Sequence, residues 1–267
     1  MQAHGFSRWV VDYTEKPEEA KTAFQLIGFH AINGGKHSSW GTYNCLNYFT
    51  ELRYIEWIGF TDFDQAKTSD NVLIQQIVAD SYKGEGFSQL AFRTDDIYSV
   101  IAHIQAKGLK PIGPFSGSRK REDGKVLSWS MLFIEDKQDD TCRYPFFIQW
   151  GEPEEARATE MAPLMQHSIG TPSLSYIGIN VSRLDESLQK YCHLFDVPRQ
   201  SVMESNDEFG AYSEFPIGNI AIRLYEAKSL TAPIDHALIN RPFLCGITGM
   251  PENKTVHIKN GVYQFTV

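Results

Sequence analysis

The side chains best suited to chemistry gather in two glycine-rich segments, and the first spans residues 34–44. Its residues run Gly-Gly-Lys-His-Ser-Ser-Trp-Gly-Thr-Tyr-Asn. His37 could act there as an acid, a base or a hydrogen-bond donor at the mouth of a cleft, because loops often carry function and imidazole titrates near neutral pH. Thr42 and Asn44 could hydrogen-bond a ligand. The alternative is that the glycines form a tight turn that these side chains only brace.

The second segment, residues 116–125, carries the best candidates for anion binding. Arg119 and Arg121 occupy alternate positions, so an extended backbone would point both guanidinium groups the same way. Arginine captures carboxylate or phosphate groups through paired hydrogen bonds, which indicates an anionic or oxygen-rich ligand. The alternative is that both pair with neighbouring carboxylates. Asp123-Gly124 is a hairpin signal, so we expect this polar segment to be a hairpin tip or a loop over a site.

A repeated pattern indicates which elements must position these residues. Short apolar runs suited to strands begin at Phe6, Phe87 and Leu174. Each leads into an amphipathic helix that ends at Gly28, Gly108 or Pro198. A recurring strand-then-helix start predicts a recurring structural unit. Because units of this kind can pair around a ligand site, the repeat bears on function as well as on fold.

The repeats predict an α+β protein built from three βαβββ units. Pro17 and the two glutamates after it make a favourable first turn for the first helix. We expect helices over residues 17–27, 69–82, 97–107 and 184–195. Beyond the opening runs, strands are expected near 29–32, 43–49, 54–60, 109–112, 126–133, 146–150, 201–203, 210–215 and 220–225.

These units group into larger parts of the chain. Units one and two, residues 1–150, are expected to pair into a curved sheet or barrel, and residues 151–172 read as a linker rich in Glu, Ala and Pro. The third unit, within residues 173–267, has no obvious fourth unit beside it. It would pair either with the C-terminal tail, which ends in a hairpin signal at Asn260-Gly261, or with a second copy of the chain in a homodimer.

Composition argues against several classes of partner. The net charge of −8 disfavours nucleic acid and anionic membranes, which favour a basic face. No stretch approaches the roughly 20 apolar residues of a membrane span. The N-terminus lacks a basic run followed by an apolar core, so we expect no signal peptide and a cytoplasmic location. The four cysteines are scattered, which favours buried thiols over a zinc site.

Several segments carry a resemblance to a known family. They are residues 34–44, Tyr54-Ile-Glu56, residues 117–124, Ser128-Trp129 and residues 145–150, Pro-Phe-Phe-Ile-Gln-Trp. With these segments the chain resembles the vicinal-oxygen-chelate superfamily and, within it, the glyoxalase-like domain family. The resemblance covers the first 150 residues well and the third unit only by its pattern. It implies two paired units that form a curved sheet or barrel around a small-molecule site.

The resemblance also suggests where a metal would bind. In metal-binding members of the superfamily, the opening and closing strands of paired units supply His or Glu ligands, and sometimes Gln. These places map onto Arg8 or Trp9, Glu56, Gln89 and Gln149. One carboxylate, two neutral amides and no imidazole are a weak donor set, and an arginine would repel a cation. We therefore expect no metal and no cofactor, although His37 or a shifted strand that brings in His4 would improve the set.

Glu56 is either a polar residue that faces a wet cleft or a general base in a partly apolar barrel. Trp129 is more typical of a core than of a stacking site. We expect a protein that binds a small polar or anionic molecule between units one and two, with or without transforming it. The alternative is a metal-dependent lyase, isomerase or dioxygenase that uses Glu56. The catalytic candidates are Glu56 and His37, and the ligand-binding candidates are Thr42, Asn44, Gln89, Arg119, Arg121, Trp129 and Gln149.

Overall fold

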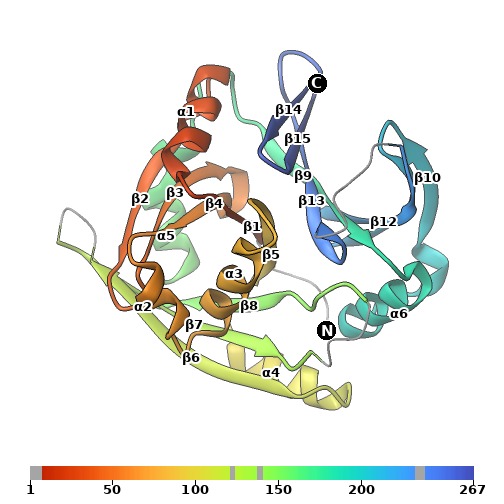
Figure 1. The fold of residues 1–267 in the computed structure, drawn as a ribbon, viewed down its shortest axis with the longest axis horizontal. Helices are drawn as coiled ribbons and strands as arrows, with labels where there is room; N and C mark the ends of the chain where they lie inside the picture. The colour runs from red at the N-terminus through yellow and green to blue at the C-terminus, as the bar shows by residue number, and fades with distance from the viewer. Residues whose placement is uncertain (1–7, 121–123, 137–140, 232–237) are drawn as a thin grey trace.

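The structure is a computed structural model that describes residues 8–120, 124–136, 141–231 and 238–267. Two curved β-sheets stand beside one another, the first in warm colours to green and the second in green to blue (Figure 1). The first sheet has eight strands and the second has seven. The predicted α+β class with repeated βαβββ units is confirmed.

Unit one contains β1 (Arg8–Tyr13), α1 (Pro17–Ile27), β2 (Ile32–His37), β3 (Thr42–Phe49), the 3-10 turn η1 (Thr50–Leu52) and β4 (Arg53–Phe60). Helix α1 has the predicted bounds. Pro17 opens it, acidic residues fill its first turn, and Gly28 ends it with a left-handed φ of 110°. Its apolar face buries Ala20 and Phe24 against the sheet. Helix α1 therefore covers one face of the sheet and holds β3 in position.

Two helices lead to unit two, which repeats the first. They are α2 (Phe63–Lys67) and α3 (Val72–Ser81). The unit itself contains β5 (Gly86–Arg93), α4 (Ile97–Ala106), β6 (Pro111–Lys120), β7 (Val126–Ile134) and β8 (Phe146–Trp150). Asp96 caps α4, because its carboxylate accepts hydrogen bonds from the backbone N–H groups of Tyr98 and Ser99.

The strand order in the first sheet shows how the two units pair. It runs β2-β3-β4-β1-β5-β8-β7-β6, with β1 and β5 antiparallel at the centre and Val10 opposite Leu90. Each central strand then pairs in parallel with the last strand of its own unit. In unit one Val11 lies opposite Glu56, and in unit two the matching pair is Ala91 and Phe146. The structural counterpart of Glu56 is therefore an apolar side chain, Phe146.

Two strands differ from the prediction because their glycines look like turn signals. The strand expected near residues 29–32 is β2, so the Gly-Gly-Lys-His segment belongs to the sheet and is not a loop. It pairs with β3 through an irregularity between Asn33 and Gly35. The strand expected near 109–112 continues as β6 through Lys120, which places Arg119 opposite Leu127 of β7. The expected turn residue Asp123 lies outside the described residues.

The second sheet settles how the third unit is completed. Unit three contains β9 (Ser173–Val181), α6 (Leu184–Phe195) with its predicted bounds, η3 (Arg199–Ser201), β10 (Met203–Asp207), β11 (Gly210–Ile217) and β12 (Ile220–Leu230). The tail adds β13 (Arg241–Thr248), β14 (Lys254–Ile258) and β15 (Gly261–Thr266). The strand order is β10-β11-β12-β9-β13-β15-β14, so the tail lies beside β9 as unit two lies beside β1. Of the two alternatives for unit three, the structure shows pairing with the tail.

Residues 151–172, expected as a linker, hold a helix. It is α5 (Glu154–Met161), which continues into the 3-10 helix η2 (Ala162–Met165). Pro153 precedes α5 and two glutamates fill its first turn, which are favourable features for a helix start. The segment after it is held to the first sheet, because His167 Nε2 lies 2.9 Å from the carbonyl oxygen of Tyr48. The helix therefore packs beside the outer strands of unit one.

The two sheets are joined by a buried polar network as well as by apolar packing. The Arg241 guanidinium is fully buried and donates to the carbonyl oxygen of Phe87 at 2.8 Å. Trp57 Nε1 donates to the Tyr263 hydroxyl at 2.9 Å, and that hydroxyl donates to Asp12. The sheets thus share one core. Among the described residues, no helix is long and apolar enough to cross a membrane.

Candidate functional site

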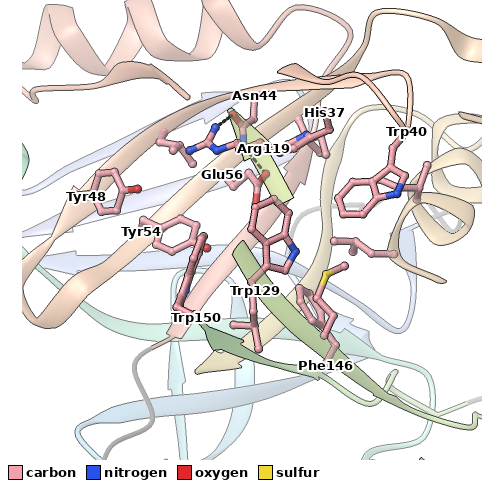
Figure 2. A pocket seen from close by; sticks show the side chains of 16 residues that line it. His37, Trp40, Asn44, Tyr48, Tyr54, Glu56, Arg119, Trp129, Phe146 and Trp150 are labelled. Carbon is pink, nitrogen blue, oxygen red and sulfur yellow. Dashed lines mark hydrogen bonds between the residues drawn. The ribbon is translucent and has the colours of Figure 1, made fainter. Parts of the chain in front are cut away.

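A cavity of about 50 Å³ lies within the curve of the first sheet. Strands from both units supply its walls, and Leu73 and Ile74 of α3 close one side. Figure 2 shows Arg119, Asn44 and Glu56 beside one another, with Trp129 and Trp150 facing them. The lining residues are His37, Trp40, Asn44, Leu46, Tyr48, Tyr54, Glu56, Ile58, Leu73, Ile74, Arg119, Trp129, Met131, Phe146, Ile148 and Trp150.

Three polar side chains in this cavity form one hydrogen-bonded chain. Arg119 Nη1 donates to Asn44 Oδ1 at 3.2 Å, and Asn44 Nδ2 donates to Glu56 Oε1 at 2.6 Å. The dashed lines in Figure 2 follow these two bonds. Asn44 is buried and bridges a cation from unit two to a carboxylate from unit one. The amide therefore fixes the orientation of both charged groups at the cavity surface.

Two glycines of β2 explain why this chain of residues can form. A side-chain carbon on Gly34 would come within 2.0 Å of Asn44 Oδ1. One on Gly35 would come within 3.0 Å of Arg119 Nη1, and Gly35 also has a φ of 143°, which favours glycine. Any larger residue would displace the two polar groups. The glycine pair that resembles a turn in the sequence thus makes room for the site.

His37 closes another part of the cavity as a neutral side chain. Its Nδ1 lies 3.1 Å from Thr42 Oγ1, and both residues are buried. Burial, assisted by the positive charge of Arg119, lowers the pKa of His37 to about 3. The imidazole is therefore uncharged near neutral pH. It can exchange hydrogen bonds with a ligand there, but it is a weak proton acceptor.

Tryptophans make up much of the opposite wall. The ring centroids of Trp40 and Trp129 lie 5.9 Å apart, and those of Trp129 and Trp150 lie 5.5 Å apart. Gly117, opposite Trp129 in the ladder, provides the space, because a side-chain carbon there would come within 2.4 Å of Trp129 Nε1. The indole nitrogen of Trp150 is buried and has no hydrogen-bond partner among the described residues. Such a donor is available to a bound molecule.

A buried cation lies behind this wall. The Arg157 guanidinium of α5 stacks over the Trp150 ring at 3.9 Å, and the residue is 5% exposed. It makes no ion pair or side-chain hydrogen bond among the described residues, although the carboxylates of Glu152 and Glu154 lie within electrostatic reach. Tyr54, in the cavity floor, lies within electrostatic reach of both Arg157 and Glu56. Burial raises the pKa of Tyr54 well above its usual value, so its hydroxyl stays protonated.

The structure brings most of the residues expected from the sequence together. Glu56, His37, Asn44, Arg119 and Trp129 line the cavity. Thr42 lies behind them and contacts His37. Arg121 lies outside the described residues.

Two expected ligand-binding residues are not in the cavity lining. Gln149 faces α4, where its Oε1 accepts a hydrogen bond from the backbone N–H of Ile97 at 2.9 Å. Gln89 lines a different hollow, beside Arg143. The expected match between Glu56 and Gln149 was therefore wrong by three residues, because the β5–β8 register places Phe146 at the matching position.

Sequence reasoning missed part of the cavity, namely Tyr48, Tyr54, Trp40 and Trp150. A signal for three of them was present. Side chains alternate along a strand, so Tyr54 shares a face with Glu56, Tyr48 shares one with Asn44, and Trp150 shares one with Phe146. No comparable signal exists for Arg157, since its position depends on how α5 docks.

The residues at this site do not fit a transition-metal ion of the kind that the superfamily resemblance implies. Within the part of the chain that the structure describes, Glu56 is the only carboxylate that lines the cavity, and one of its oxygens accepts from Asn44. Arg119 places a positive charge beside them. No group of three or more His, Cys, Asp and Glu side chains suited to a metal occurs among the described residues. One carboxylate beside a guanidinium is a poor donor set for such an ion.

The fold and the cavity together define the class of protein. Two βαβββ units paired about antiparallel β1 and β5, with a site inside the curved sheet, are the glyoxalase-like arrangement. The model of the glyoxalase-like domain family matches residues 10–195. The chain therefore belongs to the glyoxalase-like domain family.

The chain is similar to several solved structures, and those with a TM-score above 0.5 support the same fold. A hypothetical protein from Staphylococcus aureus is 20% identical with a TM-score of 0.81, and the match covers 98% of this chain and 99% of that one. A variant of 4-hydroxymandelate synthase from Streptomyces coelicolor is 13% identical with a TM-score of 0.51, covering 90% of this chain and 69% of that one. Methylmalonyl-CoA epimerase from Mycobacterium tuberculosis is 16% identical with a TM-score of 0.39, covering 58% and 92%. No curated protein sequence matches the chain.

Proposed function

We propose that this protein binds a small organic acid in the cavity beside Glu56 and that Glu56 can exchange a proton with it, without a metal ion. The observation that carries the proposal is the hydrogen-bonded chain from Arg119 through Asn44 to Glu56. The guanidinium offers a partner for a carboxylate, and the Glu56 carboxylate lies at the other end of the same chain. A ligand held by Arg119 would therefore have its neighbouring carbon atoms near a proton acceptor.

The walls of the cavity support the same proposal. Aromatic rings restrict water and strengthen electrostatic interactions inside the cavity. The neutral imidazole of His37 and the protonated hydroxyl of Tyr54 can hydrogen-bond to ligand oxygens, and neither adds charge. This arrangement suits proton transfer at a carbon next to a carbonyl group, as in isomerases and lyases. A protein that binds the acid without transforming it would need Arg119 but not Glu56.

The test uses the purified chain with pyruvate, lactate and malonate as probes, and tryptophan fluorescence or calorimetry as the readout. Arg119→Met is expected to weaken binding roughly tenfold to a hundredfold, since a charge-assisted hydrogen bond is lost. Arg183→Met is the control, because Arg183 is exposed at the start of α6, outside the first sheet. Failure of all three acids to bind, or equal binding by Arg119→Met, would contradict the proposal.

The proton-transfer part has its own measurement. Deuterium uptake from D₂O into the methyl group of pyruvate, followed by NMR, should be faster with the wild-type protein than with Glu56→Gln. Equal uptake by both proteins would remove Glu56 as the proton acceptor and leave a binding protein. The metal-dependent alternative would gain support from elemental analysis if unchelated protein held a metal that Glu56→Gln lost.

The remaining expectations stay predictions. They are the cytoplasmic location, the homodimer and the absence of nucleic-acid and membrane partners. The outer strands of the second sheet, β10 and β14, are where a second copy of the chain could pair, because β2 and β6 of the first sheet contact each other. Sedimentation at micromolar concentration measures that state directly.

A further inference from the structure

The inner cavity shares part of its lining with a much larger groove, which lies between unit one, unit two and the segment that follows them. Leu46, Tyr48 and Arg119 line both spaces. The groove has a volume of about 750 Å³, against about 50 Å³ for the cavity. The cavity has room for only a few heavy atoms, since a water needs about 10–15 Å³ measured in this way. A ligand larger than that must extend past Arg119 into the groove.

The two sides of the groove differ in a way that suits a chain-like molecule. One side is β2, where Gly34 and Gly35 leave a stretch of backbone without side chains between Asn33 and Lys36. The other side is apolar and comes from the segment after unit two. Its groove-lining residues are Met161, Pro163 and Leu164, joined by Leu127 of β7. A smooth backbone facing apolar side chains is suited to an aliphatic chain more than to a second polar group.

Charge in the groove is positive near the cavity. Arg119 lies at the junction, and the exposed Lys36 lies on the same side as the glycines. Glu160 also lines the groove and pairs with Lys125 at 2.6 Å, and because Lys125 pairs with Glu152 as well, at 2.8 Å, the charge of Glu160 is offset only in part. An anionic group at the junction would therefore lie next to the positive charge of Arg119, and the apolar surface of the groove would lie beyond it.

We infer that the ligand is a carboxylic acid with an oxygenated head and a medium-length aliphatic chain. The head occupies the cavity beside Glu56, the carboxylate pairs with Arg119 at the junction, and the chain lies along the groove against Leu164. The inference rests on the proposed function for the head and adds the chain. It also assigns a role to the end of the segment 154–165, which belongs to neither βαβββ unit: Met161, Pro163 and Leu164 form the apolar side of the binding groove.

The test compares lactate with 2-hydroxyoctanoate, which has the same head and five more methylene groups. If about half of the transfer free energy of those methylenes is realised in an open groove, the longer acid binds about 30-fold more tightly. Leu164→Glu should remove most of that gain and leave lactate binding unchanged. Leu164→Ala should remove part of it and disturbs the fold less. Leu26→Glu is the control, because Leu26 is 85% exposed on α1.

The outcomes separate this inference from the proposed function. If lactate binds through Arg119 but 2-hydroxyoctanoate binds no more tightly, the chain-binding groove is wrong and the proposed function stands. If the longer acid binds equally to the wild type, Arg119→Met and Leu164→Glu, its binding is unspecific and the inference is wrong. If neither acid binds, both proposals fall.

Discussion

Asn44 donates a hydrogen bond of 2.6 Å from its amide nitrogen to Glu56, and its amide oxygen accepts from Arg119. One neutral residue therefore satisfies a carboxylate and a guanidinium that come from different units of the fold. Loss of Asn44 would leave both groups with a missing partner in a largely buried place. This relationship makes Asn44 as important to the site as the two charged residues that it joins.

Asn44→Ala should lower the free energy of unfolding by about 1–3 kcal/mol, since buried polar groups lose a partner. It should also weaken acid binding, because Arg119 and Glu56 are no longer oriented. Urea denaturation measures the first effect and tryptophan fluorescence the second. Asn206→Ala, at an exposed position on β10, is the control and should change stability little. A stable Asn44→Ala protein with normal acid binding would contradict the bridging role.

Gly35→Ala tests whether the glycine pair of β2 serves the site. The new methyl group would lie 3.0 Å from Arg119 Nη1, at a φ of 143°. We expect a loss of roughly 1–3 kcal/mol from backbone strain and displacement of Arg119, and weaker acid binding. Gly108→Ala is a matched control, with a φ of 70° and no atom within 4 Å of the new group. It should cost stability without changing acid binding, whereas equal effects of both variants on binding would contradict the packing argument.

Sequence patterns predicted those parts of the fold whose local and tertiary preferences agree. Helices α1 and α6 were predicted with the bounds that they have, because acidic first turns and amphipathic faces mark them. Strand β2 was misplaced, because Gly34 and Gly35 resemble a turn and no local signal shows the ladder to β3. Residues 151–172 were read as a linker, since the docking of α5 onto unit one leaves little trace in composition.

The same contrast holds for the site. His37, Asn44 and Arg119 stood out because glycines surround them, and the structure shows that two of those glycines make room for Asn44 and Arg119. Gln149 was matched to Glu56 because the residues on either side of each are the same, Ile before and Trp after. The register of parallel strands, however, depends on long-range pairing that a single sequence does not reveal. Arg157 could not have been found, because it reaches the cavity wall only through the position of α5.

His37 should make stability fall in mild acid. Its pKa is about 3 in the folded protein, because of burial and Arg119, against 6.5 for an unperturbed imidazole. Below pH 6.5 the unfolded chain therefore binds more protons, and folding loses up to roughly 2 kcal/mol between pH 6.5 and 5. His37→Gln should remove this part of the pH dependence, while His257→Gln, at an exposed position, should not. Parallel pH profiles for wild type and His37→Gln would contradict the burial of a neutral imidazole.

Asp12 should have the opposite effect. Burial raises its pKa to about 7 from 3.8, although the Tyr263 hydrogen bond and the charge of Arg241 act against burial. The folded protein then holds a proton that the unfolded chain has released, so stability falls as pH rises from about 4 to about 7 and is level above that. The upper limit is roughly 4 kcal/mol.

Asp12→Asn imitates the protonated form and can still accept from Tyr263. The wild type should therefore lose stability relative to this variant across that pH range, in denaturation at fixed temperature. A constant difference between the two proteins from pH 4 to 8 would show that Asp12 does not titrate there.

Arg157 and Arg241 are both buried, yet their substitutions should have opposite effects. Arg241 donates to the Phe87 carbonyl oxygen and lies 3.7 Å from Asp80, whereas Arg157 stacks on Trp150 and makes no ion pair among the described residues. A buried cation without a directly paired anion costs folding free energy, and the nearby charges of Glu152 and Glu154 offset only part of this cost, so Arg157→Met should keep or raise stability by about 1 kcal/mol. Arg241→Met should lower it by about 1–3 kcal/mol, because the Phe87 carbonyl oxygen loses its donor while Asp80 keeps its pair with Arg143.

The binding data decide why Arg157 is there. If its positive charge favours an acid in the cavity, Arg157→Met should be as stable as the wild type and bind lactate several-fold more weakly, with a smaller loss for Arg157→Lys. A variant that is less stable but binds lactate normally would instead show that stacking on Trp150 is the main role of Arg157. If Arg157 serves ligand binding, Arg157→Met should be more stable than the wild type and bind lactate more weakly. The reason is that the buried charge of Arg157 destabilises the free protein, whereas in the complex the bound acid compensates it.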